Sequence, residues 1–256
     1  MAGSATAAIR VRGLRTRFGP QVVHDNLDLE VRYGEVLGVV GASGTGKSVL
    51  LRAVVGLLKP AAGSIEVLGH DISRLGAAER REIESRTGVL FQDGALFSSL
   101  TVAQNVQVPL REHTSLPQDV IDEITAVKLG MVGLPPEAAC KYPSELSGGM
   151  RKRAGLARAL ALDPEIVCLD EPTAGLDPIG AAAFDGLVRR LQRTLGITVF
   201  MVTHDLDSLW AICDRIAVLA EKQVLVVGPM EVMLQHEHPW VRSYFHGPRA
   251  RAQRSE

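Results

Sequence analysis

The stretch "GASGTGKS", Gly41 to Ser48, decides the fold class of this chain of 256 residues. It has a glycine, four intervening residues and then Gly-Lys-Ser. The apolar run "EVLGVV" precedes it, and the helical run "SVLLRAVVGLL" follows it. A strand, a glycine-rich turn and a helix in this order direct successive backbone N–H groups, and the positive end of the helix dipole, at a phosphate. The sequence therefore predicts a phosphate-binding loop in an α/β fold.

Two side chains of this loop have specific roles in the prediction. We expect Lys47 to reach the β- and γ-phosphates of a nucleotide, and Ser48 to offer its hydroxyl group to Mg²⁺. Further nucleotide contacts are expected from Gly41, Ser43, Gly44, Thr45, Gly46 and Val49.

A pair of carboxylates, Asp170 and Glu171, ends the apolar run "EIVCLDEP". Ligands of open α/β sheets sit at the carboxyl ends of the strands, so we expect the pair to lie beside the phosphates. Asp170 is predicted to hold Mg²⁺, mostly through water, and Glu171 to orient the attacking water and accept its proton. Together with the phosphate-binding loop, this pair predicts a P-loop NTPase.

Two kinds of apolar run outline the rest of the fold. Short runs that alternate apolar and polar residues predict an antiparallel sheet near the N-terminus; they are "AIRVRGL", "NLDLEVR" and "SIEVLG". Nearly continuous runs, interleaved with helical stretches, predict a parallel sheet covered on both faces; they are "EVLGVVGA", "TGVLFQ", "EIVCLDEP" and "ITVFMVTH". We therefore expect an α/β core with an antiparallel β lobe in front of it.

More than 70 residues, from Asp93 to Pro164, separate the second and third predicted parallel strands. This is too long for a simple crossover. Thr101 and Gln104 have the spacing of a capping box, which opens a helix that Pro109 is expected to end or kink. Prolines at positions 117, 135 and 136 punctuate further helical runs. The pattern predicts a helical subdomain, about residues 93–162, inserted into the core.

Composition limits the classes of function. Lys and Arg number 28 and Asp and Glu 29, so no overall positive charge favours binding to nucleic acid. The three cysteines have no neighbouring Cys or His partners, which argues against a disulfide framework or a zinc site and favours a reducing cytosol. No apolar run approaches the roughly 20 residues that a membrane span needs. We expect a cytoplasmic protein that meets a membrane only through a partner.

The segment "LSGGM", Leu146 to Met150, precedes "RKRAGLARALALDPEIVCLDEP" and thus the acidic strand. Here the sequence resembles the ATP-binding cassette (ABC) family, whose signature is usually written LSGGQ and whose fold is a RecA-like core with an antiparallel β lobe and a helical subdomain. The resemblance implies that Ser147, Gly148 and Gly149 dock on ATP held by a second subunit, in a head-to-tail homodimer. Met150 stands where glutamine is usual and cannot donate an amide hydrogen bond.

The resemblance assigns four further residues. Phe18 matches the aromatic residue that stacks on adenine, and Gln92 matches the glutamine that contacts Mg²⁺ and the attacking water. Asp177, in "AGLD", matches the segment that passes between the two subunits. His204, in "VTHD", matches the histidine that contacts the γ-phosphate, which we place after the last strand. The basic run at residues 151–153 is expected to be a solvated helix face or a contact to the partner's nucleotide.

Longer strings narrow the resemblance to one branch of the family. "FQDGALF", "PLREHT" and "YPSELSGGM" are similar to the ATPase subunits of the Mla system and of relatives that work with MCE-domain lipid-binding proteins. The branch implies ATP-driven phospholipid transport between inner and outer membranes, from the cytoplasmic face of the inner membrane. Its partners would be an integral-membrane permease and an MCE-domain protein, with a small regulatory subunit as an optional addition. Residues 93–113, with Ala95, Leu96 and Phe97, would line the groove that receives the permease.

Alternatives stay open at this stage. One is an ABC import ATPase for a polar solute; another is a soluble ABC protein that works as a nucleotide-driven clamp in translation or DNA repair. The expected nucleotide-binding domain is residues 1–246, followed by a basic, flexible tail at 247–256. For the aromatic residues Trp240, Tyr244 and Phe245, docking on a neighbouring subunit and local packing are both open.

Overall fold

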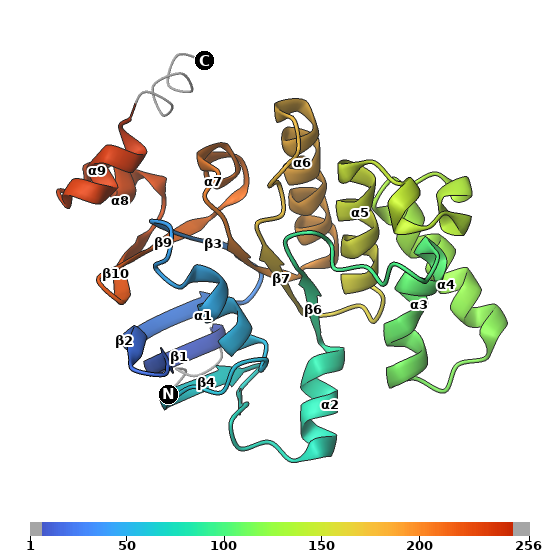
Figure 1. Cartoon of the computed structure of the whole chain (residues 1–256), viewed down its shortest axis with the longest axis horizontal. Helices are drawn as coiled ribbons and strands as arrows, with labels where there is room; N and C mark the ends of the chain where they lie inside the picture. Colours follow the sequence, from blue (N-terminus) through green and yellow to red (C-terminus); the bar gives the residue numbers. More distant parts are fainter. Residues whose placement is uncertain (1–6, 248–256) are drawn as a thin grey trace.

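The antiparallel lobe predicted near the N-terminus is present in the computed structural model, which describes residues 7–247 (Figure 1). Strands β1 (Ala7–Phe18) and β2 (Gln21–Arg32) form a long hairpin. Strands β4 (Ala62–Val67) and β5 (His70–Asp71) continue the sheet on the other side of β1, and all of these pairings are antiparallel.

The second sheet carries the predicted parallel strands and two more. Its pairings are parallel except for the edge pair β9–β10, which is antiparallel. Strands β9 and β10 come from "RIAVLA" and "QVLVVG", so β8 is not the last strand and our placement of His204 behind a last strand was wrong. In spatial order the strands are β10 (Gln223–Gly228), β9 (Arg215–Ala220), β3 (Val36–Gly41), β8 (Thr198–Val202), β7 (Ile166–Asp170) and β6 (Thr87–Leu90).

Every residue of β3, β7 and β8 is buried, which explains their nearly continuous apolar sequences. One face of the sheet packs with α1 (Lys47–Val54) and the antiparallel lobe, and the other with α6 (Pro178–Leu195) and the helical subdomain. In β7, Cys168 points into the core formed with α1 and the antiparallel lobe. Its neighbours Val167 and Leu169 point into the core on the opposite face, formed with α6 and the helical subdomain. The remaining helices around this sheet are α2 (Ala77–Ser85), α7 (Leu206–Ile212), α8 (Met230–Gln235) and α9 (Pro239–Phe245).

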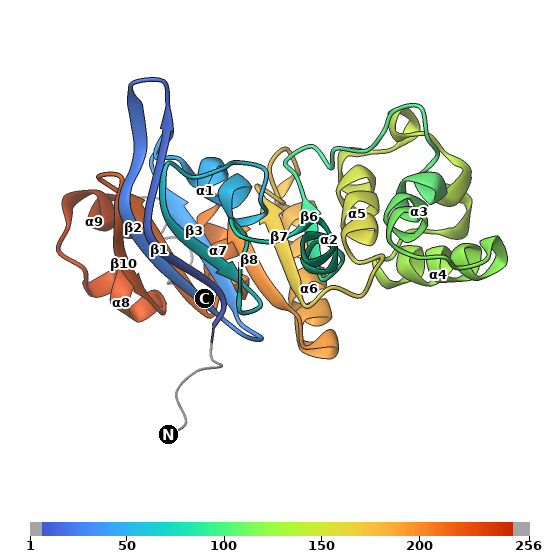
Figure 2. The ribbon, with the colours of Figure 1, turned by 90° about the horizontal axis from the view of Figure 1, so that it is seen from below.

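The segment between β6 and β7 is mainly helical and extends to one end of the molecule, opposite α8 and α9 (Figure 2). Thr101 opens its first helix with a capping box: Thr101 Oγ1 accepts from Gln104 N at 3.3 Å, and Gln104 Oε1 accepts from Thr101 N at 2.9 Å. This helix continues through Pro109 to His113, so the proline does not end it. The elements are α3 (Val102–His113), α4 (Gln118–Met131), the 3₁₀ turns η1 (Pro136–Cys140) and η2 (Pro143–Glu145), and α5 (Gly148–Ala159).

None of the helices described between residues 7 and 247 has both the length and the apolar composition to cross a membrane.

Candidate active site

The phosphate-binding loop connects the end of β3 to the start of α1 and depends on its glycines. Gly44 and Gly46 have φ angles of 81° and 95°, in the left-handed region that disfavours residues with a Cβ atom. At Gly46 a Cβ atom would also lie 2.4 Å from Val23 Cγ1 and 2.5 Å from His24 Nε2. Strand β2 of the hairpin therefore packs directly against the loop, and only a glycine fits at position 46.

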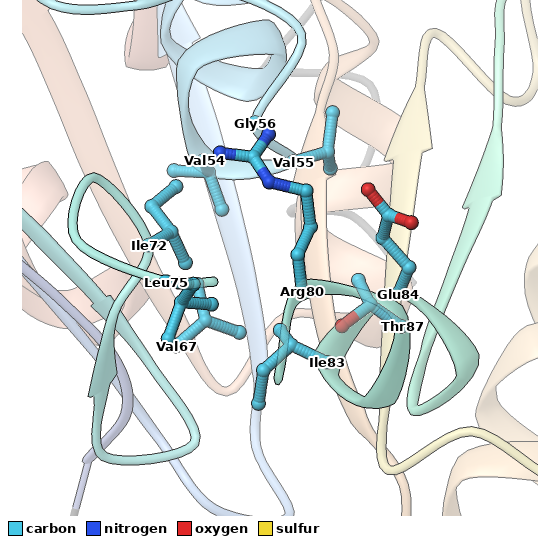
Figure 3. Close-up of a pocket in the computed structure, with 10 residues that line it drawn as sticks. All are labelled: Val54, Val55, Gly56, Val67, Ile72, Leu75, Arg80, Ile83, Glu84 and Thr87. Atoms are coloured by element: carbon cyan, nitrogen blue, oxygen red, sulfur yellow. The ribbon is translucent and has the colours of Figure 1, made fainter. Parts of the chain in front are cut away.

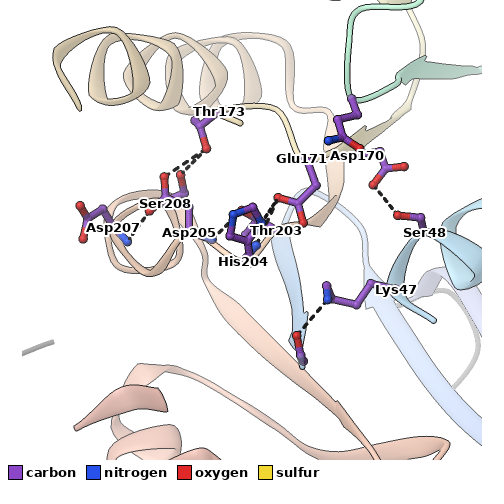
Figure 4. Close-up of polar contacts among 12 residues, drawn as sticks. Lys47, Ser48, Asp170, Glu171, Thr173, Thr203, His204, Asp205, Asp207 and Ser208 are labelled. Atoms are coloured by element: carbon purple, nitrogen blue, oxygen red, sulfur yellow. Dashed lines mark hydrogen bonds and ion pairs between the residues drawn. The ribbon is translucent and has the colours of Figure 1, made fainter. Parts of the chain in front are cut away.

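Lys47, the first residue of α1, lies at the mouth of this loop. Its Nζ atom donates to the carbonyl oxygens of Gly41 at 2.9 Å and Ala42 at 3.1 Å. Burial lowers the pKa of Lys47, while the nearby carboxylates of Glu171 and Asp170 act in the opposite direction. The ammonium group is thus held between the loop and the acidic pair (Figure 4).

Ser48 and Asp170 meet where α1 approaches the end of β7. Ser48 Oγ donates to Asp170 Oδ1 at 2.9 Å, and burial raises the pKa of Asp170. A hydroxyl and a carboxylate oxygen suit Mg²⁺, which usually keeps several waters and also binds substrate phosphates. No cluster of three or more His, Cys, Asp or Glu side chains in the described part of the chain could hold a metal ion. The residues present therefore fit a Mg²⁺ ion whose remaining ligands are phosphate and water.

Glu171 lies against His204 because β7 and β8 are neighbouring parallel strands. Glu171 is the first residue after β7, and His204 is the second residue after β8. Glu171 Oε2 lies 2.7 Å from His204 Nδ1 and accepts from the His204 backbone N–H at 3.3 Å. Glu171 has a φ of +49°, a strained conformation for a residue with a side chain. Its backbone N–H donates to Val202 O at 2.8 Å, which helps to hold this conformation.

Gln92 follows β6, the strand next to β7, and its side chain is exposed. Its carbonyl oxygen accepts a hydrogen bond from Lys152 Nζ, which also donates to Glu171 O at 2.9 Å. Lys152 is only 5% exposed, so the interpretation of residues 151–153 as a solvated face was wrong for its central residue. The physical reason is that this side of α5 faces the segment after β6 rather than solvent, as the close approach of Gly155 to Gly94 shows.

The predicted signature residues begin α5, as expected for an anion-binding helix N-terminus, but far from the phosphate-binding loop of the same chain. Ser147 is the N-cap, and its Oγ accepts from Met150 N at 3.2 Å. The Met150 side chain packs against the core. In both views α1 and α5 lie on opposite sides of β6 and β7 (Figures 1 and 2). Gly148 instead approaches Leu176, next to Asp177, whose Oδ1 caps α6 by accepting from Gly180 N at 2.9 Å.

The aromatic residues differ in their surroundings. Phe18 is 51% exposed at the turn end of β1. Phe245 is fully buried in a core shared by β9, α7 and α8, and Trp240 stacks on Tyr244 with ring centroids 4.9 Å apart. Tyr244 also donates from its hydroxyl to His204 O at 2.8 Å. The aromatic residues of α9 thus pack within their own chain, Phe245 fully and Trp240 and Tyr244 in part, so docking of the latter two on a neighbouring subunit stays a prediction. The predicted tail after Gly247 lies outside the described residues.

Of two hollows on the surface, one includes predicted site residues and the other does not. A cleft of about 910 Å³ runs between Glu171, His204, the Ala174–Leu176 turn and α9. A much smaller apolar pocket, about 40 Å³, lies between α1, β4 and α2, with Arg80 extending toward Gly56 (Figure 3). It contains none of the predicted site residues and is far below the usual size of a ligand pocket.

A phosphate-binding loop beside a hydroxyl–carboxylate pair and a second carboxylate at the strand ends defines the class of a P-loop NTPase. Residues 24–174 match the family model described as ABC transporter, and residues 142–209 also match one described as AAA domain, putative AbiEii toxin, Type IV TA system. The chain belongs to the ABC transporter family and is an ATP-binding ATPase of that family.

Named relatives support this assignment. The chain is 44% identical over 242 residues to the "Probable ribonucleotide transport ATP-binding protein mkl" of Mycobacterium leprae, covering 94% of this chain and 70% of the relative. It is 42% identical over 239 residues to the "Intermembrane phospholipid transport system ATP-binding protein MlaF" of Haemophilus influenzae, covering 93% and 90%.

Solved structures show the same fold. The ATP-binding cassette MJ0796, in a dimeric post-hydrolysis state bound to ADP and Pi, matches with a TM-score of 0.79 and 28% identity, covering 86% of this chain and 98% of that one. The protein cbiO1 from Clostridium perfringens, part of the ABC transporter complex cbiONQ, matches with a TM-score of 0.81 and 29% identity, covering 98% and 100%.

Proposed function

We propose that this chain is the ATPase subunit of a transporter that moves phospholipid between the inner and outer membranes. The contacts between Ser48 and Asp170 and between Glu171 and His204, at one edge of the sheet beside Lys47, carry the hydrolytic part of the proposal. The similarity to the phospholipid-transport relative, which extends over 93% of the chain, supports the cargo.

In the proposed mechanism, the loop N–H groups and Lys47 hold the β- and γ-phosphates of ATP. Ser48 and Asp170 would hold Mg²⁺, with Gln92 beside it, and the ion would neutralise phosphate charge. Glu171 accepts the proton of a water molecule that attacks the γ-phosphorus, and the bond from that phosphorus to the β-phosphate oxygen breaks. A positioned general base contributes about 10²- to 10⁴-fold to such a step. His204, held by Glu171, contacts the γ-phosphate.

The separation of the two phosphate-binding elements supports a head-to-tail homodimer. Ser147, Gly148 and Gly149 form the N-terminus of α5, which can bind an anion. Helix α5 lies on the other side of β6 and β7 from α1, the helix that begins with Lys47 (Figure 1). A second copy turned by a two-fold axis would bring its signature onto the nucleotide. Phe18 would stack on the adenine, and Asp177 would lie at the contact between the copies.

The loop after Gln92 offers a preformed surface for a permease. Ala95 is exposed and the Phe97 side chain is 52% exposed. The fully buried Asn105 accepts from Phe97 N at 2.7 Å and donates to Phe97 O at 3.1 Å, while Arg158 donates to Ala95 O at 2.7 Å. A nearby hollow includes His113, at the end of α3. Exposed apolar residues on a tightly bonded loop are typical of a docking site, and binding there would place the chain on the cytoplasmic face of the inner membrane.

Purification of the membrane complex through a tag on this chain tests the proposal. We expect a permease, an MCE-domain protein and phospholipid to co-purify. A second candidate is a transporter for a polar solute, favoured by the ribonucleotide-transport name of the mycobacterial relative. Bound nucleotide cargo without phospholipid would establish that candidate instead, and recovery of no integral-membrane protein would contradict both.

The hydrolytic part is tested by Glu171→Gln. The variant should bind ATP with wild-type affinity, lose turnover and accumulate as ATP-bound dimers in gel filtration. Hydrolysis at the wild-type rate would contradict the role of Glu171 as the base.

A further inference from the structure

Lys152 is a buried lysine that the sequence-based prediction did not connect with Glu171 or with hydrolysis. Its side chain is 5% exposed, and its Nζ atom donates to two backbone carbonyl oxygens, those of Gln92 and of Glu171. We propose that Lys152 is a positioning residue for ATP hydrolysis, which fixes the backbone of Glu171 and of Gln92 and joins both to the signature helix. The inference rests on the proposed function, in which Glu171 accepts the proton of the attacking water.

The geometry at Glu171 supports this role. A non-glycine residue at φ +49° costs roughly 1–2 kcal/mol, so neighbouring contacts must hold it there. Both backbone polar groups of Glu171 are used for this. The N–H donates to Val202 O at 2.8 Å, and the carbonyl accepts from Lys152 at 2.9 Å and from Ala174 N at 3.2 Å. The resulting conformation aims the carboxylate at His204. Without the ammonium group, the Glu171 backbone loses one of these three hydrogen bonds, the one from a charged donor.

Comparison with a second buried lysine argues against a purely structural role. Lys128 is 4% exposed and forms an ion pair with Asp163, the usual way to bury an ammonium group. Lys152 bonds to uncharged carbonyl groups instead. Burial lowers its pKa, and the carboxylates of Asp93, Glu171 and Asp170 partly offset this effect. Burying a charge without an ion pair lowers the stability of the folded chain. A contact that lowers stability in this way is better explained by a role in the reaction than by a role in folding.

Lys152 also lies two residues after the end of the signature, on α5. The Ser147 end of α5 would bind the nucleotide of the partner subunit, while Lys152 contacts the catalytic segments of its own subunit. A shift of α5 when the partner's ATP docks is thereby transmitted to Glu171 and Gln92. Lys152 would thus link the two ATP sites of the dimer through a single side chain.

The test compares Lys152→Met, Lys152→Arg and Lys128→Met in the full-length chain, purified in its membrane complex. Loss of a hydrogen bond from a charged group predicts that kcat of Lys152→Met falls about 10- to 100-fold. We expect the KM for ATP to stay within about threefold, because Lys47 and the loop are intact. Lys152→Arg, which keeps the charge and the donors, should recover most of the rate. Lys128→Met should lower the melting temperature without this loss of kcat.

Two results would overturn the proposal. One is a kcat of Lys152→Met within threefold of wild type. The other is an equal loss of kcat in Lys152→Met and Lys128→Met, which would show that any buried lysine of the subdomain has the same effect. Glu171→Gln, measured in parallel, separates this failure from that of the proposed function: if it hydrolyses ATP normally, the base assignment itself is wrong.

Discussion

Asp185 lies on the face of α6 toward α7. We predict that this residue lowers the free energy of unfolding as the pH rises from 5 to 7.5. It is 2% exposed, and its Oδ2 accepts from Ser208 Oγ at 2.7 Å. Its Oδ1 atom is buried without a hydrogen-bond partner among the described residues. Burial raises the pKa of Asp185 from 3.8 to about 6; Asp205 and Asp207 act in the same direction, and the Ser208 hydrogen bond acts against them.

The sign follows from which state binds the proton more tightly. Between pH 3.8 and about 6 the folded chain keeps this carboxyl protonated while the unfolded chain loses the proton. The stabilisation is therefore fully present below pH 3.8 and is lost as the pH rises through 6. The complete shift corresponds to about 3 kcal/mol, of which about 1.4 kcal/mol falls between pH 5 and pH 7.5.

Urea unfolding of the wild type and of Asp185→Asn, followed by tryptophan fluorescence, measures this contribution. Trp210 on α7 lies two residues from Ser208 and is a suitable reporter. The free energy of unfolding of the wild type should fall by about 1.4 kcal/mol more than that of Asp185→Asn over this pH range. Replacement of the exposed Asp119 by Asn serves as the matched control. Parallel pH profiles for wild type and Asp185→Asn would refute the argument that burial keeps this carboxyl protonated.

Three further changes probe separate parts of the site. Gly46→Ala should weaken binding of a fluorescent ATP analogue at least tenfold, because the left-handed φ alone costs about 1–2 kcal/mol and the new Cβ would clash with Val23; wild-type affinity would contradict the strain argument. Phe97→Asp should release the permease in pull-down experiments while circular dichroism stays unchanged, and Leu57→Asp, at a similarly exposed position, should not. Tyr244→Phe removes the hydrogen bond to His204 O, worth about 1 kcal/mol, and should lower kcat about fivefold at unchanged ATP affinity; an unchanged kcat would show that α9 does not position His204.

The parts of the site that sequence could predict are those whose chemistry is local. The loop from Gly41 to Ser48 needs glycines at fixed spacing next to a strand and a helix, and all of this is visible in consecutive residues. Asp170 is similar, because the end of an apolar run marks the edge of the sheet where ligands bind. The strands β9 and β10 have the same apolar character as the predicted strands, and the prediction missed them.

Contacts between distant segments were not predictable in this way. Lys152 stands in a basic run, and a charged run on a helix is usually solvated; only the packing of α5 against the segment after β6 makes it buried. The Tyr244 hydroxyl reaches His204 across 40 residues of sequence. Neither partner carries a local pattern that marks the contact, since both depend on how α5 and α9 are placed on the sheet.

The loop after β6 is held to α5 by basic side chains that bond to its backbone, and in the proposed transporter this would limit how ATP can signal to the permease. Lys152 binds the carbonyl of Gln92, and Arg158 binds those of Gly94 at 2.9 Å and Ala95 at 2.7 Å. Gly155 lies so close to Gly94 that a Cβ atom would be 3.1 Å from its Cα and its oxygen. Because these contacts leave little room for sliding, the loop and α5 should move together. A displacement of the signature end of α5 would then also displace the exposed Phe97, without any rearrangement inside the loop.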